Sequence, residues 1–252
     1  MFDLNGKVAI VTGGNGGIGL GMARGLARAG AALAIIGRNE EKNAAAIQEL
    51  KEFGGKVSAY VLDVTDSDSI VRVFDSIAKD LGSIDILVNN AGMNIRGRVE
   101  NLAEEDWHTV MDTNVTSAFL CSKAAYGHLK QAGGGKVLNC GSMYSLFGSA
   151  WAPAYATSKG AVVQLTKSLA VDWAEDNIQV NCFLPGWIDT DLTRWVRGEV
   201  PELHDKVEQR APAGRWGVPK DMEGIAVFLA SEASDFITGA AIPVDGGYSI
   251  QG

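Results

Sequence analysis

Short apolar runs alternate with amphipathic segments along the whole chain. Runs rich in aliphatic and β-branched residues predict buried strands at 7–11, 32–36, 57–62, 85–88, 136–140, 178–183 and 241–244. Apolar positions at three- and four-residue spacing predict helices at 20–29, 40–53, 67–81, 104–130 and 219–230, and in the segment that carries Tyr155. Strands that are apolar throughout and separated by helices are typical of a parallel sheet covered on both faces. We therefore expect an α/β fold: a single Rossmann-type doubly wound domain over residues 1–252, its seven-stranded parallel sheet flanked by helices on both faces.

Composition and charge narrow the classes of partner. The chain of 252 residues carries a net charge of −8 and no long basic run, which speaks against nucleic acid or an anionic membrane as a partner. No apolar run approaches the roughly 18 residues of a membrane span. Residues 1–7 lack the basic-then-apolar layout of a signal peptide. These features predict a cytoplasmic protein.

The cysteines and histidines give no sign of a metal. Three cysteines are too few and too scattered for a disulfide framework or a zinc site, and the three histidines show no ligand spacing. Cys140 and Cys182 fall in apolar runs, where Cys acts as a small buried hydrophobe. We expect no bound metal.

A glycine-rich segment, Thr12-Gly-Gly-Asn-Gly-Gly-Ile-Gly19, joins the first strand to the first helix. A helix N-terminus presents unpaired N–H groups and a partial positive charge, and glycines let the backbone approach a pyrophosphate. The segment therefore predicts a dinucleotide site. Two registers fit the spacing: Gly14-x-Gly16-x-x-Gly19 and Gly13-x-x-x-Gly17-x-Gly19.

The end of the second strand indicates which dinucleotide is bound. It reads Gly37-Arg38-Asn39, and the first carboxylate is that of Glu40. An acidic residue at the strand end would hold the ribose 2′-hydroxyl of NAD, whereas Arg pairs with a 2′-phosphate through its planar fork. We predict NADP as the preferred cofactor and NAD as the runner-up, because Glu40 can still turn inward.

Tyr155 and Lys159 are four residues apart in a predicted helix and so share one of its faces. A cation beside a phenol favours the phenolate and lowers the phenol pKa from about 10 toward the working range, as an acid/base Tyr requires. The pair alone also fits a surface Tyr beside a solvated Lys. The other motifs decide between these interpretations.

Taken together, the motifs resemble those of the short-chain dehydrogenase/reductase family. The resemblance runs from Lys7 to the closing Val244-Asp-Gly-Gly247. It implies an NAD(P)-dependent oxidoreductase that interconverts a secondary alcohol and a ketone, and it favours the longer glycine register. The matching positions are the glycine segment, Asn89-Asn90-Ala91-Gly92, Asn114, Ser142, Tyr155-x-x-x-Lys159 and Pro185-Gly186.

The resemblance implies a role for each matching catalytic residue. Tyr155 would be the general acid/base, and Ser142 would hydrogen-bond the substrate oxygen, although a Ser at a strand end also caps turns. Lys159 would lower the Tyr155 pKa and hold the nicotinamide ribose. Asn114 would hold a water that links Lys159 to solvent as a proton relay, although it also fits an indifferent helix position.

The same matching assigns contacts to the cofactor. Asp63 and Val64 would lie against the adenine, although Asp63 also fits the N-cap of the following helix. Asn90 would lie near the adenosine ribose, and Ile188 and Thr190 would meet the carboxamide end. The remaining expected contacts are Gly13, Asn15, Gly17, Ile18, Gly19, Arg38, Ala91, Gly92, Tyr155, Lys159, Pro185 and Gly186.

Substrate choice is expected in three variable pieces: the loop after the Asn-Asn-Ala-Gly turn, the residues after Ser142, and the irregular segment 187–215. Arg96 fits a bidentate clamp on a substrate carboxylate and equally a solvated loop charge. The residues expected to contact substrate are Asn94, Arg96, Met143, Tyr144 and Trp187.

Three further stretches suggest a subgroup. Arg215-Trp-Gly217, residues 237–241 and Asp245-Gly-Gly-Tyr248 resemble the 2-deoxygluconate 3-dehydrogenases and gluconate 5-dehydrogenases. The expected substrate is then a sugar acid, a polyol or a similar small hydroxy or keto compound. The family commonly forms tetramers, so we expect a homotetramer.

Two other functions remain open. A 3-oxoacyl-carrier-protein reductase shares the catalytic set, but Glu175, Asp176 and the net charge of −8 would repel an acidic carrier. A dinucleotide-binding sensor without catalysis is disfavoured because the whole catalytic set is present.

Overall fold

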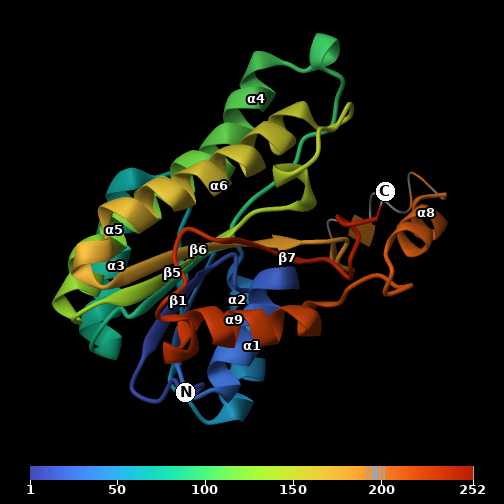
Figure 1. The fold of residues 1–252 in the computed structure, drawn as a ribbon. Helices are drawn as coiled ribbons and strands as arrows, with labels where there is room; N and C mark the ends of the chain where they lie inside the picture. Colours follow the sequence, from blue (N-terminus) through green and yellow to red (C-terminus); the bar gives the residue numbers. More distant parts are fainter. Residues whose placement is uncertain (192, 195–197, 199, 201, 252) are drawn as a thin grey trace.

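The computed structural model describes residues 1–191, 193–194, 198, 200 and 202–251, and its strands form one parallel sheet (Figure 1). The strands are β1 Val8–Thr12, β2 Ala32–Gly37, β3 Val57–Val61, β4 Ile86–Asn89, β5 Gly135–Cys140, β6 Ile178–Pro185 and β7 Ala241–Val244. The α-helices are α1 Gly17–Arg28, α2 Glu40–Leu50, α3 Ser67–Leu81, α4 Glu104–Met111, α5 Ser117–Gln131, α6 Pro153–Asp172, α8 Leu203–Arg210 and α9 Glu223–Ala230. Shorter helical turns are η1 Lys51–Phe53, η2 Val99–Asn101, η3 Asp112–Thr116, η4 Met143–Ser145, η5 Ala174–Asp176, η6 Pro219–Met222 and η7 Glu232–Ser234.

The predicted strand pattern is confirmed, because alternate residues of each strand enter opposite cores. In β1, Ala9 and Val11 pack beneath α1 and α9, whereas Val8 and Ile10 pack beneath α3, α5 and α6. Figure 1 shows these two groups of helices on opposite sides of the sheet. A strand buried on both faces has no polar face, and this explains the continuous apolar runs.

The strand order places a ligand site at the centre of the sheet. The order is β3-β2-β1-β4-β5-β6-β7, and β1 pairs in parallel with both β2 and β4. The chain therefore leaves β1 in one direction for the first half of the sheet and in the other direction for the second half. Such a reversal opens a crevice beyond the carboxyl ends of the strands.

The helix predicted over 104–130 is three elements rather than one. Helix α4 leads into the π-helical turn η3, which leads into α5. Asn114 lies in η3, and π-turns inside α-helices are frequent at functional sites. The other predicted helices shift only at their ends: α2 stops at Leu50 and continues as η1, and α9 is preceded by η6.

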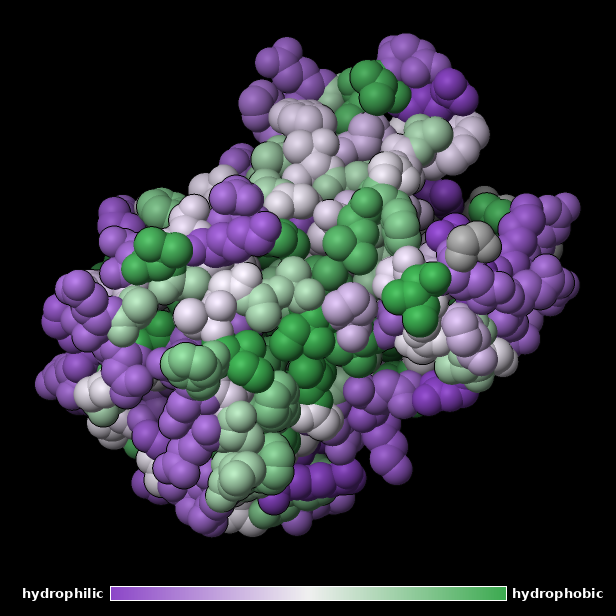
Figure 2. Space-filling model, viewed as in Figure 1, coloured by the Kyte–Doolittle hydropathy of each residue, from purple (hydrophilic) through white to green (hydrophobic). Residues whose placement is uncertain are grey.

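The outer surface is polar at its margins, while apolar residues gather across the middle of the face in Figure 2, around β7. Val171, Phe236 and Ile250 are among the strongly exposed apolar side chains. Within the described residues, no helix has the length and apolar character needed to cross a bilayer.

Candidate active site

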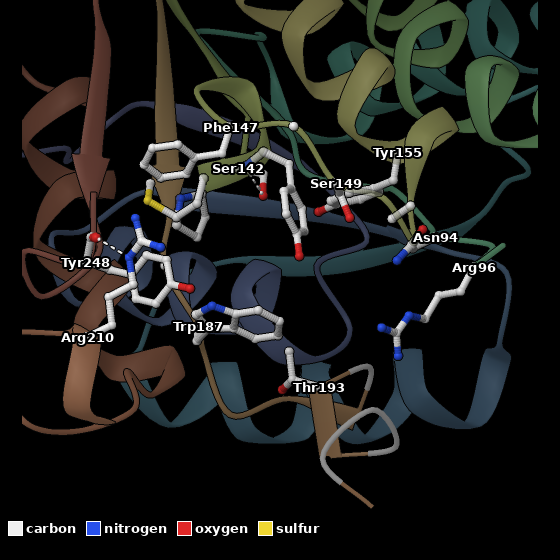
Figure 3. A pocket seen from close by; sticks show the side chains of 16 residues that line it. Asn94, Arg96, Ser142, Phe147, Ser149, Tyr155, Trp187, Thr193, Arg210 and Tyr248 are labelled. Atoms are coloured by element: carbon white, nitrogen blue, oxygen red, sulfur yellow. Dashed lines mark hydrogen bonds between the residues drawn. The ribbon is translucent and has the colours of Figure 1, made fainter. Parts of the chain in front are cut away.

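Among the cavities at the carboxyl ends of the strands, two hold most of the predicted site residues. The first, of about 460 Å³, lies beyond β1, β2 and β4 and is lined by the glycine turn and by the ends of β2 and β3. The second, of about 320 Å³, contains Ser142 and Tyr155 (Figure 3). We call them the cofactor cavity and the substrate cavity, after the residues that the sequence assigned to each. Seven of the predicted cofactor residues line the first: Gly13, Asn15, Arg38, Asp63, Val64, Ala91 and Gly92.

The glycine turn adopts the longer of the two predicted registers. Gly13 and Gly17 have φ of +63° and +51°, which only glycine adopts without strain. A Cβ on Gly19 would collide with the Gly13 carbonyl and with the Asn90 side chain. Gly16, by contrast, has extended backbone with φ of −174° and open space around it. The turn delivers the N-terminus of α1 to the cavity, with Ile18 packed against the core behind it.

Asn90 holds the glycine turn in place. Its Nδ2 donates to the carbonyl oxygens of Thr12 and Gly13, at 3.1 and 3.2 Å. The backbone N–H groups of Asn90 and Ala91 donate to Thr12 Oγ1, at 3.0 and 3.1 Å. The side chain predicted to lie near the adenosine ribose is therefore committed to the backbone of the turn.

Arg38 and Asp63 face each other across the cofactor cavity. Arg38 Nη1 lies 3.6 Å from Asp63 Oδ2, and the Arg38 side chain is 77% exposed. The pKa of Asp63 is lowered by the Thr65 backbone N–H first and by Arg38 to a lesser degree. The alternative interpretation of Asp63 as an N-cap is wrong, because Asp66 caps α3 by accepting from the Ser69 N–H. Asp63 instead accepts from the Thr65 backbone N–H and hydroxyl and lines the cavity.

Asn15, a predicted cofactor contact, and Asn43, which the sequence reasoning missed, connect the glycine turn to the strand end. Asn15 Nδ2 donates to Asn43 Oδ1 at 2.6 Å, and Asn43 Nδ2 donates to the Gly37 carbonyl at 2.9 Å. A Cβ on Gly37 would collide with both side chains. The bridge therefore requires glycine immediately before Arg38.

Tyr155 and Lys159 share one face of α6, as predicted. Lys159 Nζ lies 5.5 Å from the centre of the Tyr155 ring and donates to the Cys140 carbonyl at 2.7 Å. The lysine is 3% exposed. A buried ammonium held by a strand-end carbonyl has little freedom, so its position beside the phenol is fixed by β5.

Lys159 lowers the pKa of Tyr155, as predicted, but the predicted net direction of that pKa is wrong for the protein by itself. Burial raises the pKa of Tyr155, and the charge of Lys159 lowers it by less. The net direction is upward from the ordinary value of about 10. The sequence revealed the charge of Lys159 but not the burial of the Tyr155 phenol, and burial has the larger effect on the Tyr155 pKa.

Ser142 follows β5 and is fixed by a residue that the sequence reasoning missed. Ser145 Oγ accepts the Ser142 backbone N–H at 3.1 Å and donates to the Lys159 carbonyl at 2.8 Å. Ser142 Oγ accepts the Tyr144 N–H at 3.2 Å, so the turn-capping interpretation of Ser142 is also correct. The Ser-x-x-Ser spacing of a capping box was a signal for Ser145.

Asn114 joins the loop after β4 to α6. Its Oδ1 accepts the Met93 N–H at 2.8 Å, and its Nδ2 donates to the Met93 carbonyl and to Ser158 Oγ, both at 2.9 Å. Asn114 is therefore no indifferent helix position. Both donor hydrogens of its amide are used, so its side chain serves to hold the loop rather than to donate to a relay water.

The substrate cavity gathers all five residues predicted to contact substrate, together with Pro185 and Gly186. Tyr144 packs edge-on against Tyr155 with ring centres 6.1 Å apart, and Trp187 packs edge-on against Trp216 at 5.6 Å. The sequence reasoning missed Phe147, Ser149, Thr193, Arg210 and Tyr248, which also line the cavity (Figure 3). Of the predicted substrate segment 187–215, residues 192, 195–197, 199 and 201 lie outside the described residues.

Ile188 and Thr190 occupy different surroundings. Thr190 reaches the glycine turn, where a Cβ on Gly17 would meet its Cγ2 at 3.2 Å. The Ile188 side chain is buried in the core and its backbone bridges to Gly217. The Ile188 side chain is therefore committed to the core, and its predicted cofactor contact stays a prediction.

Other candidate chemistry is limited. Cys121, Cys140 and Cys182 are buried free thiols, as the apolar runs predicted for two of them. Burial raises the pKa of Cys121 and of Cys182 to about 12, so neither is a thiolate at neutral pH. Across the described part of the chain, no three His, Cys, Asp or Glu side chains gather to hold a metal ion.

Comparison with known proteins agrees with this geometry. A family model described as "Enoyl-(Acyl carrier protein) reductase" matches residues 13–249. The chain belongs to the short-chain dehydrogenase/reductase family, whose members are NAD(P)-dependent oxidoreductases.

Particular relatives are similar over nearly their whole length. The chain is 41% identical to a gluconate 5-dehydrogenase of Gluconobacter oxydans (strain 621H), over 99% of this chain and 97% of that protein. It is also 41% identical to a 2-dehydro-3-deoxy-D-gluconate 5-dehydrogenase of Escherichia coli (strain K12), covering 98% and 97%. A solved gluconate 5-dehydrogenase of Burkholderia cenocepacia J2315, in complex with NADP and tartrate, superposes with a TM-score of 0.94 at 39% identity, covering 100% and 98%. The predicted subgroup is thereby confirmed.

Proposed function

We propose that the protein interconverts a secondary alcohol and a ketone on a sugar acid or similar small hydroxy acid, with NADP as the preferred cofactor. The observation that carries the proposal is the substrate cavity, in which the Ser142–Tyr155 pair shares its walls with Arg96 and Arg210. Hydroxyl and amide groups of the same walls suit a polyhydroxy chain, and arginine suits its carboxylate. The identity of 41% with a gluconate 5-dehydrogenase supports this substrate class.

In this proposal Tyr155 exchanges a proton between its phenolic oxygen and the substrate oxygen. NADP, when bound, supplies the hydride acceptor or donor. The raised pKa keeps the phenol protonated at neutral pH, which suits the donation of a proton to a ketone oxygen as it is reduced. For the reverse reaction the phenol must lose that proton, so alcohol oxidation is favoured by higher pH.

Ser142 acts as a fixed hydrogen-bond donor. Because its Oγ accepts the Tyr144 N–H, the hydroxyl hydrogen is left to donate to a substrate oxygen in the cavity. Ser145 holds the Ser142 backbone against α6 and keeps the donor at a constant distance from Tyr155. Preorganisation of this kind costs nothing at the moment of reaction.

Lys159 and Asn114 assist the Ser142–Tyr155 pair indirectly, through charge and through positioning. The charge of Lys159 stabilises the phenolate form of Tyr155. In this proposal the Lys159 ammonium would also donate to a hydroxyl of the nicotinamide ribose. Asn114 fixes the loop that carries Asn94 and Arg96 through its two bonds to Met93. We propose that the backbone of η3, rather than the Asn114 side chain, holds the water that would relay protons between Lys159 and solvent. The i→i+5 hydrogen-bond pattern of this π-helical turn differs from that of the flanking α-helices.

The cofactor cavity fits a dinucleotide. A Cβ on Gly19 would collide with the Gly13 carbonyl, so the tight turn requires glycine there. The turn leads into the N-terminus of α1, which suits a pyrophosphate. Gly13, Asn15 and Gly17 would hold the pyrophosphate, and Asp63 and Val64 the adenine. Arg38 would exchange its contact with Asp63 for a ribose 2′-phosphate, which carries more charge. NADP is therefore preferred over NAD.

A substrate screen tests the proposal. Purified protein is assayed with NADP⁺ and with NAD⁺ against sugar acids, polyols and short hydroxy acids, and with NADPH against keto-sugar acids and an acetoacetyl thioester. We expect the highest kcat/KM on a sugar acid with NADP⁺. A strong preference for the thioester would instead establish the carrier-protein reductase, and binding of NADPH without any turnover would establish the sensor.

The assembly and location are proposed separately. We propose a homotetramer that covers exposed apolar side chains such as Phe236 and Ile250, and a cytoplasmic location. Light scattering on the purified protein tests the first, with a mass near four times 26.6 kDa expected. Fractionation of the source cells tests the second, and enrichment in a membrane or secreted fraction would contradict it.

A further inference from the structure

The cation at the end of α8 has a defined place in the substrate cavity. Arg210 is the last residue of α8, and it lines the cavity that contains Ser142 and Tyr155. Its guanidinium carbon lies 5.2 Å from the centre of the Phe147 ring and 4.6 Å from that of the Tyr248 ring. Figure 3 shows the guanidinium between the two rings. Three segments far apart in the chain thus converge on one charged group.

These contacts fix the guanidinium but leave most of its donors unused. Nε donates to the Tyr248 carbonyl at 3.3 Å. No described residue accepts from the two terminal nitrogens, which form the fork that matches a carboxylate. A planar cation held between two rings loses less freedom on binding than an unsupported side chain. The geometry is that of a preorganised anion site.

The charge balance of the cavity supports an anionic ligand. Most arginines of the described chain, such as Arg24, Arg28 and Arg215, form ion pairs with Glu or Asp. Arg96 and Arg210 form none in that part of the chain, and both line the substrate cavity. None of the described lining residues of this cavity is acidic. In a chain of net charge −8, a cavity with two cations and no carboxylate among these residues is suited to a negative substrate group.

The two cations lie on opposite sides of the Ser142–Tyr155 pair (Figure 3). The reacting oxygen of the substrate is fixed at that pair. A carboxylate bound at Arg210 would therefore direct the carbon chain one way across the cavity, and a carboxylate bound at Arg96 would direct it the opposite way. The choice of arginine therefore decides which face of the carbonyl is turned to the cofactor. Arg96 belongs to a loop, and among the described residues no aromatic ring stacks on it and no side chain holds its guanidinium, so a carboxylate gains more at Arg210.

We propose that Arg210, held by Phe147 and Tyr248, is the anchor for the substrate carboxylate and sets the orientation of the carbon chain. This inference rests on the proposed function, because it presumes a hydroxy-acid substrate. It gives the 187–215 segment a definite role, since α8 brings the anchor to a cavity whose reacting groups come from β5 and α6.

The test compares acid and neutral ligands of one carbon skeleton. In the Tyr155→Phe background, in which turnover is expected to be slower by about 10²–10⁴-fold, the NADP⁺ complex is titrated with D-gluconate and with D-glucitol, using tryptophan fluorescence from the cavity as the readout. Adding Arg210→Gln is expected to weaken gluconate binding by at least about tenfold and to change glucitol binding by less than about twofold. The matched variant Arg96→Gln is expected to weaken gluconate binding by less than Arg210→Gln does.

The outcomes separate the two proposals. Equal weakening of gluconate and glucitol by Arg210→Gln would assign Arg210 a packing role and overturn the anchor, as would a larger effect of Arg96→Gln on gluconate. If the parent protein binds short hydroxy acids but no sugar acid, and Arg210→Gln still weakens only the acids, the anchor stands and the proposed substrate class fails. If it binds neutral polyols alone, both fail. A Tm within about 2 °C of the parent value shows that each variant is folded.

Discussion

The polar side chains of the cofactor cavity are bonded to other protein groups, whereas the arginines of the substrate cavity are left without acidic partners among the described residues. In the cofactor cavity the side chains bind one another: Asn90 holds the glycine turn, Asn15 is bridged to Asn43, and Arg38 faces Asp63. In the substrate cavity Arg96 and Arg210 have no acidic partner among the described residues. The difference indicates that the first site is built before its ligand arrives, whereas the second keeps its strongest groups for the ligand.

The largest expected effect lies in the substrate cavity, at Tyr155. Replacement Tyr155→Phe removes the proton that the substrate oxygen must exchange, and kcat should fall by about 10²–10⁴-fold. The NADP affinity should change by less than about twofold, since the phenyl ring remains. Steady-state kinetics and nucleotide titration measure the two quantities.

The matched control for this variant is Tyr144→Phe. Tyr144 lies in the same cavity with its ring edge-on to Tyr155, yet it is not positioned by Lys159. Its loss should reduce kcat by less than about tenfold. Comparable losses in the two variants would contradict the assignment of the acid/base to Tyr155.

The next effect tests the charge of the cofactor cavity. Replacement Arg38→Asp places a second carboxylate opposite Asp63 and removes the partner of a 2′-phosphate. The ratio of kcat/KM for NADP⁺ over NAD⁺ should fall by about 10–100-fold. Arg72→Asp, an exposed change on α3 of the same charge, is the control and should leave the ratio unaltered. A parent protein that uses both cofactors equally would contradict the role of Arg38.

A third change tests whether the glycine turn is built in advance. Replacement Gly19→Ala would place a Cβ against the Gly13 carbonyl and Asn90, and should lower the free energy of unfolding by about 1–3 kcal/mol while weakening NADP binding. In α5, a Cβ on Gly127 would meet no atom within 4 Å, so Gly127→Ala should stabilise the protein slightly. Chemical denaturation measures both. An unaltered stability of the Gly19 variant would mean that the turn moves freely.

The smallest effect concerns the balance between burial and charge at Tyr155. Because the charge of Lys159 lowers the Tyr155 pKa, replacement Lys159→Met should move that pKa further above its ordinary value. The neutral phenol would then persist to still higher pH, and the phenolate absorbance would appear later in an alkaline titration of the protein alone. Subtracting the titration of the Tyr155→Phe, Lys159→Met double variant isolates this residue. A downward shift would contradict the lowering of the Tyr155 pKa by Lys159, and a parent pKa below about 10 would show that burial does not dominate there.

Much of the cofactor side could be predicted from the sequence, because its groups are close together along the chain. The residue types and spacing of segment 12–19 and of the strand end at Arg38 predict phosphate binding without any knowledge of the fold. The structure places both segments around one cavity. Asn43 was missed because its bridge to Asn15 depends on how α2 approaches the glycine turn. The Tyr155 pKa was misjudged because a sequence shows neighbouring charges but not the extent of burial.

The substrate side could be predicted only as a region. The irregular composition of 187–215 marked it, and Arg96 was weighed as a carboxylate clamp on the strength of its residue type. Nothing in the order of residues connects Phe147, Arg210 and Tyr248, which come from a loop, a helix end and the C-terminal segment. Their meeting depends on the path of the chain over the sheet.

The sequence by itself determined the class of fold, the family, the reaction type and the pair that performs it, because periodicity and short motifs are local properties. The tertiary structure decided the glycine register, the engagement of Asn90 and Asn114 with the backbone, and the partners of each described arginine. It also decided that burial outweighs the charge of Lys159 at Tyr155. These properties depend on desolvation and on contacts between distant segments, which exist only once the sheet has brought the strand ends to one edge.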